Sequence, residues 1–118
     1  MIRLGAVSLA ALAALAFAGA PARAPARLGV TAKEFHLLLS RQTVKAGRVV
    51  IELVNRGQDV HDLRLRRIGG TQTYELPTTS SGTRATLEAR LRSGRYRLWC
   101  SIADHRARGM SAVLRVRR

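Results

Sequence analysis

The sequence predicts an all-β fold: a small antiparallel Greek-key β-sandwich that follows an N-terminal targeting segment. Three observations carry this prediction. Apolar and polar residues alternate over short segments, turn signals recur at short intervals, and long helical periodicity is absent. About seven short strands of this kind are typical of a small sandwich. A chain of 118 residues is expected to form one domain.

Residues 1–26 are predicted to be a secretory signal peptide. Arg3 precedes an apolar run over residues 4–18, and small residues follow up to Ala26. This is the layout of a signal peptide, and the run is shorter than the roughly 20 residues that a membrane span requires. We expect cleavage after Ala26, with retention of the segment as an N-terminal membrane anchor as the alternative. The folded domain is then residues 27–118, exported to the periplasm or the extracellular space.

The strands of this domain are predicted from alternation and from the turns between them. The first is β-prone but alternates imperfectly; the second and third place Ile51 and Leu65 on apolar faces. The fourth is short and precedes the most evident loop, residues 77–83. The fifth turns Leu87 inward, the sixth ends at Cys100, and the last closes the domain. In chain order the predicted strands are residues 28–40, 48–55, 60–67, 71–76, 84–91, 95–100 and 111–118.

The domain is strongly basic. The chain has 21 Lys and Arg residues against seven acids, and residues 27–118 alone keep a net charge of +12. Such a charge ordinarily favours nucleic acid. Here the arginines are scattered through alternating strands and not gathered on a helix or beside stacking aromatic residues, and an exported protein does not meet nucleic acid. We therefore expect no nucleic-acid partner, and favour an acidic protein or an anionic membrane surface.

The stretch "CSIADHRARGM" contains the only cysteine of the chain, Cys100. His105 follows it by five positions and Met110 by five more. A single cysteine excludes an internal disulfide, so any special role of Cys100 depends on its thiolate. Cys100 ends one predicted strand and Met110 precedes the next, so the loop between them is placed to bring the three side chains together.

A metal site in this loop needs a further donor. His61 begins a strand after a loop, and such junctions lie close together at one end of a sandwich, whereas His36 lies within the first predicted strand and is expected to point outward. Zinc binds Cys and His but has no use for a thioether; two His, one Cys and a weak axial Met are the donors of blue-copper electron-transfer sites. Taken singly, each residue also fits a plain structural role.

With these residues the chain resembles the cupredoxins, the plastocyanin- and azurin-like type 1 blue copper proteins. The resemblance spans Val30 to Val116. It rests on "VHDL" at residues 60–63 and on "SGRYRLWCSIADHRARGM" at residues 93–110, with Cys-x4-His-x4-Met spacing. It implies a cupredoxin-like copper-binding domain that holds one copper ion, cycling between Cu(I) and Cu(II). The ligands that the resemblance implies are His61, Cys100, His105 and Met110.

Two positions depart from the cupredoxin pattern. Relatives with this loop often have Pro-Gly before the second ligand His, where this chain has Ala103-Asp104, and Asn after the first, where it has Asp62. Because outer residues orient metal ligands, we expect both changes to loosen the surroundings of the site. They leave all four donors in place.

The function that the resemblance implies is one-electron transfer between redox partners by a monomeric protein that is not an enzyme. A periplasmic copper carrier or scavenger would use the same ligands and stays open as the alternative. A Cys-His nucleophile is disfavoured because no orienting residue or oxyanion-hole motif is identifiable. Arg106 and Arg108 flank His105, either as a docking rim for an acidic redox partner or as a solvated face.

Overall fold

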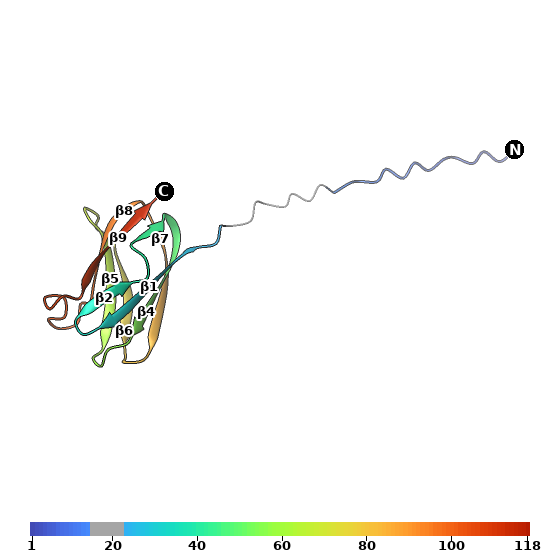
Figure 1. Ribbon diagram of the computed structural model, residues 1–118. Coiled ribbons are helices and arrows are strands. Elements are labelled where there is room, and N and C mark those ends of the chain that lie inside the picture. Colours follow the sequence, from blue (N-terminus) through green and yellow to red (C-terminus); the bar gives the residue numbers. More distant parts are fainter. Residues whose placement is uncertain (15–22) are drawn as a thin grey trace.

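The computed structural model describes residues 1–14 and 23–118. Within them nine strands form two sheets packed face to face, which confirms the predicted all-β sandwich (Figure 1). The strands are β1 (Ala26–Lys33), β2 (His36–Leu39), β3 (Thr43–Lys45), β4 (Gly47–Asn55), β5 (His61–Arg67), β6 (Thr73–Thr79), β7 (Arg84–Leu91), β8 (Gly94–Trp99) and β9 (Ser111–Arg117).

The two sheets have the orders β2-β1-β4-β7 and β3-β9-β8-β5-β6. The chain changes sheet before and after β3, between β4 and β5, and before and after β7. Most neighbouring strands are antiparallel, as predicted. The pairs β1–β4 and β3–β9 are parallel. A parallel pair needs a crossover between its two strands, and β3, which belongs to the opposite sheet, lies within the connection from β1 to β4.

The first predicted strand was too long. Residues 28–40 form a hairpin of two strands, β1 and β2, in which Lys33 pairs with His36 across a turn made by Glu34 and Phe35. The hairpin explains the imperfect alternation, because the turn resets which side chains face the core. His36 is exposed on β2, as predicted.

The other differences lie at sheet edges. Strand β3 was not predicted, since three residues are too few to show alternation. Strand β6 continues to Thr79, through Pro77, where the sequence favoured a loop. Proline lacks the N–H that an inner strand needs, but it is tolerated in β6 because this strand has a neighbour on one side only.

The core lies between the sheets, and Cys100 and Met110 belong to it. Both are fully buried, together with aliphatic side chains of β4, β5 and β8. Interior side chains of small domains are closely packed and rarely change rotamer without cost. The two sulfur atoms are therefore held by the core and not by a mobile surface loop. The largest of the fully buried side chains are Leu28, Ile51, Leu53, Leu63, Leu65, Leu76, Leu91, Leu98, Met110, Leu114 and His61.

The N-terminal segment precedes the sandwich. Residues 1–14 are exposed and form neither helix nor strand, and β1 begins at Ala26. The predicted signal peptide, residues 1–26, falls partly on residues 15–22, which lie outside the described residues, so the peptide and its cleavage site stay predictions. Among the residues that the structure describes, no helix has the length and apolar character to cross a membrane.

Candidate metal centre

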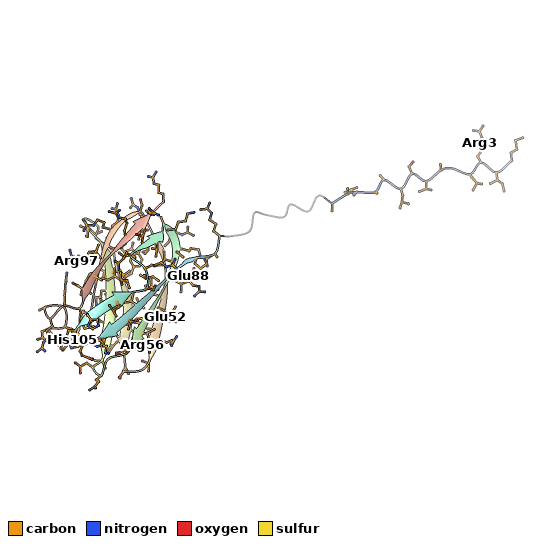
Figure 2. All side chains as sticks on the ribbon, in the orientation of Figure 1. Arg3, Glu52, Arg56, Glu88, Arg97 and His105 are labelled. Carbon is orange, nitrogen blue, oxygen red and sulfur yellow. The ribbon has the colours of Figure 1, made fainter. Side chains whose placement is uncertain are left out.

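Three predicted ligands converge at one end of the sandwich. His61 opens β5, Cys100 directly follows β8, and His105 lies in the loop before β9. Figure 2 shows His105 at the end of the sandwich away from the C-terminus marked in Figure 1. The Nδ1 atoms of His61 and His105 lie 3.9 Å and 3.7 Å from the Cys100 Sγ. One donor atom from each residue lies within 4.8 Å of the others, and all three residues are buried.

The ligand loop is fixed at both ends by backbone hydrogen bonds. The Cys100 N–H donates to the Met110 carbonyl, and the Met110 N–H donates to the His105 carbonyl, both at 3.1 Å. Gly109 makes the tight return to β9, with a φ of +123° that favours glycine. A Cβ there would also lie 2.9 Å from the Phe35 carbonyl oxygen. The glycine thus lets the ligand loop approach the β1–β2 turn.

Met110, the fourth predicted ligand, is fully buried at the same end of the core. Its two backbone hydrogen bonds join it to Cys100, which begins the ligand loop, and to His105 within the loop. A thioether in this place suits the weak axial contact of a blue-copper site. Axial coordination by Met110 stays a prediction.

Both residues that depart from the cupredoxin pattern, Asp62 and Asp104, make hydrogen bonds next to the candidate ligands, and the expected loosening stays a prediction. Asp62 is buried, and its carboxylate accepts a hydrogen bond of 2.6 Å from the Ser101 N–H and a second bond from the Ser101 hydroxyl. These bonds fasten β5 to the residue after Cys100. An aspartate therefore makes the link between the strand of one ligand and the loop of the others.

The second departure, Ala103-Asp104, lies within the ligand loop. Ala103 adopts a φ of +44°, an uncommon conformation for a residue with a side chain. Asp104 then accepts hydrogen bonds from Arg108, through its carbonyl at 3.1 Å and through its carboxylate at 2.8 Å. The hydrogen bond from the Arg108 guanidinium also lowers the pKa of Asp104. These contacts close the loop around His105 without a Pro-Gly pair.

Two carboxylates that the sequence did not single out lie behind the imidazole rings. The His61 Nε2 is 3.0 Å from the Glu34 Oε1, and the His105 Nε2 is 3.6 Å from the Asp59 Oδ2. Backbone hydrogen bonding, first from Asp59, lowers the pKa of Glu34 to about 2, so this carboxylate is charged. Each ring thus turns Nδ1 toward the sulfur and Nε2 toward an acid. Glu34 was missed because it was assigned to the middle of a strand.

The donor set fits one copper ion. Burial raises the pKa of the Cys100 thiol, so burial alone disfavours the thiolate. A bound cation reverses this preference, because a coordinated thiol gives up its proton. Two imidazole nitrogens and one sulfur, with a buried thioether nearby, are the soft-to-borderline donors that copper takes and that zinc does not fully use.

Arg106 and Arg108, the two arginines expected to form a docking rim or a solvated face, each lie over an aromatic ring. The guanidinium of Arg106 lies 4.6 Å from the ring centroid of Trp99, and that of Arg108 lies 4.8 Å from the ring centroid of Phe35. Phe35 in turn contacts His105, with ring centroids 5.2 Å apart. Cations over aromatic faces are held by the ring quadrupole, so the Arg108 charge is kept close to His105 and the Arg106 charge is kept over Trp99.

Known proteins resemble this chain in structure and not in sequence. No protein-family model matches it, and neither does any curated protein sequence. Auracyanin A, a "blue" copper protein of Chloroflexus aurantiacus, superposes with a TM-score of 0.64 at 15% identity, over 79% of this chain and 99% of that one. The dithionite-reduced auracyanin of Roseiflexus castenholzii gives 0.63 at 14% identity, over 80% and 98%.

A third likeness is to part of a larger enzyme. The copper-containing nitrite reductase of Thermus scotoductus matches with a TM-score of 0.53 at 20% identity, over 83% of this chain but only 24% of the reductase. At such identities the likenesses show the fold. The chain has the cupredoxin fold, as the sequence predicted, with a His-Cys-His cluster at one end of the sandwich.

Proposed function

We propose that the chain is an exported type 1 copper protein that carries single electrons between redox partners. The observation that carries this proposal is the buried cluster of His61, Cys100 and His105, with both Nδ1 atoms within 4 Å of the sulfur. The auracyanin likeness supports it, because a protein described as a blue copper protein has the same fold. Export rests on the predicted signal peptide.

The protein's part in electron transfer is to hold the ligands still. When bound, copper supplies one-electron chemistry between Cu(II) and Cu(I). His61 is held by a strand and by Glu34, and Cys100 is buried and bonded through its backbone to Met110. Side chains fixed in this way need little rearrangement when the charge of the site changes by one. Met110 would supply a weak thioether donor that tunes the potential.

The proposed partner is an acidic redox protein or a carrier at an anionic membrane surface. Arg108 carries positive charge over Phe35, which contacts His105, Arg106 follows His105 in the sequence, and the domain as a whole is strongly basic. Complementary charge steers association, so it acts on the rate of encounter. Electron exchange is proposed to take place at this end, through His105.

No reaction on a substrate is proposed. The likeness to nitrite reductase covers about a quarter of that enzyme. Residues 1–14 and 23–118 contain a single cluster of possible metal ligands, formed by His61, Cys100 and His105. A copper carrier or scavenger would use the same donors. Reconstitution with copper separates the two functions: an intensely coloured Cu(II) form with reversible one-electron chemistry supports electron transfer, whereas a colourless protein that holds only Cu(I) contradicts it.

A further inference from the structure

We propose that Glu34 is a positioning residue of the metal site: its carboxylate holds the His61 ring so that Nδ1 faces the Cys100 sulfur, and its charge favours Cu(II) over Cu(I). This inference rests on the proposed copper site and names a residue that controls it. Glu34 lies in the turn between β1 and β2, far from the ligands in sequence, and its side chain is 25% exposed.

Three N–H groups converge on one oxygen of Glu34. Its Oε1 lies 2.8 Å from the Gln58 nitrogen, 2.8 Å from the Asp59 nitrogen and 3.0 Å from the His61 Nε2. The first two donors belong to the loop before β5, so the carboxylate is fixed in place independently of the histidine. An acceptor fixed in this way determines where the ring nitrogen must point.

The hydrogen bond also determines which ring nitrogen is the donor. A carboxylate accepts and does not donate, so the His61 Nε2 carries the proton and Nδ1 keeps its lone pair. That lone pair lies on the side of the Cys100 sulfur, 3.9 Å away. Metal-binding histidines commonly donate their second N–H to such a partner, which fixes the tautomer and raises the basicity of the ligand.

The loop has room for the carboxylate because residue 57 is glycine. A Cβ on Gly57 would lie 2.3 Å from the Glu34 Oε1 and 2.7 Å from its Cδ. The φ of Gly57 is not in the left-handed region, so the backbone accepts alanine there. Gly57→Ala therefore displaces the end of the Glu34 side chain without removing any charge, which gives a second and independent way to break the contact.

The two histidines differ in this respect. The His105 Nε2 lies 3.6 Å from the Asp59 Oδ2, beyond hydrogen-bond length, and the Asp59 side chain is 53% exposed. His105 is therefore not locked by its carboxylate as His61 is. The role proposed for Glu34 is therefore specific to His61.

The test compares Glu34→Gln, Glu34→Ala and Gly57→Ala with wild type. Glutamine keeps an acceptor oxygen but loses the charge, so the Cu(II) spectrum should persist, while the ratio of Cu(II) to Cu(I) affinity shifts about tenfold toward Cu(I), equivalent to a potential about 59 mV higher. Glu34→Ala and Gly57→Ala should each weaken Zn(II) and Cu(I) binding about 10- to 100-fold in chelator competition.

If Glu34 only connected the β1–β2 turn to the loop before β5, it would not affect the His61 ring. NMR of the Cu(I) or Zn(II) protein distinguishes this structural role from a positioning role. The wild-type protein should show a His61 Nε2–H protected from exchange, which Glu34→Gln retains and the two alanine variants lose. The matched control is Glu88→Gln, an exposed acid paired with Arg48 and well separated from His105 in Figure 2. Its potential, affinities and NMR signals should equal those of wild type.

Wild-type exchange rates and affinities that are unchanged in Glu34→Ala and Gly57→Ala would overturn the proposal. A wild-type His61 whose Nε2–H exchanges freely would also overturn the proposal. This result needs only the wild-type protein, so it holds even if the alanine variants do not fold. Failure of the proposed function looks different: the wild-type protein would bind Zn(II) but give no intense Cu(II) colour, and Glu34 would then be judged on Zn(II) affinity and on the His61 signal alone.

Discussion

Removing the buried carboxylate of Asp62 tests whether this residue, which stands where cupredoxins often have Asn, stabilises the fold by bonding β5 to Ser101. Asp62 is 4% exposed and accepts two hydrogen bonds from Ser101. A hydrogen bond to a charged group contributes about 1.5–3 kcal/mol to stability. Ser101 is exposed, so water replaces the bond to its hydroxyl at small cost. We therefore expect Asp62→Ala to lower the free energy of unfolding by about 2–3 kcal/mol.

The measurement is urea unfolding of the metal-free protein. The midpoint should fall with the slope m unchanged, and the melting temperature should fall by roughly 10–20 °C. Asp62→Asn keeps one acceptor and should lose about half as much. Glu88→Ala is the control, because its side chain is exposed, its ion pair with Arg48 is worth about 0–1 kcal/mol and neither residue contacts Asp62 or Ser101. An Asp62→Ala protein within about 0.5 kcal/mol of wild type would refute the reasoning.

Three further predictions concern the ligands and the surface. His61→Ala should abolish the native copper spectrum, whereas His36→Ala, an exposed residue of β2, should leave it intact; equal damage from both would show that the distant ligand was chosen wrongly. Met110→Gln should keep copper bound and lower the reduction potential, because an oxygen donor favours Cu(II), and an unchanged potential would remove Met110 from the coordination sphere. Arg106→Glu, which keeps the Asp104–Arg108 contacts of the ligand loop, should slow electron transfer with an acidic partner and weaken its dependence on salt, with the copper spectrum unchanged; a wild-type rate that is independent of ionic strength would argue against electrostatic docking there.

Much of the fold was predictable because a half-buried strand leaves a period of two in the sequence. Ile51 and Leu65 were expected in the core from alternation, and both are fully buried. The β1–β2 hairpin was missed for the opposite reason. Its turn is made by Glu34 and Phe35, which lack the glycine, proline or asparagine that normally marks a turn. Only the pairing of the two strands, a non-local property, reveals it.

In the candidate site, too, some residues were predictable from the sequence and others were not. Cys100 and His105 were predictable because rare donor types stand at fixed spacing on one loop, and His61 because its loop meets that loop at one end of a sandwich. The partners behind the rings were not predictable. Glu34 reaches His61 across 27 positions of sequence, and its role depends on the hairpin that alternation did not reveal. A single acidic residue in a turn does not by itself indicate that it bonds a metal ligand.

The central claim, that His61, Cys100 and His105 hold a type 1 copper ion, is tested most directly by the absorption spectrum of the Cu(II) protein beside that of Cys100→Ser. The intense colour of such a site arises from charge transfer between the thiolate and Cu(II). The account predicts that the wild-type protein is intensely blue or green and is bleached reversibly by one electron, and that the serine variant lacks the band even with copper bound. A Cys100→Ser protein with the full colour, or a wild-type protein that takes up Cu(II) without it, would contradict the assignment.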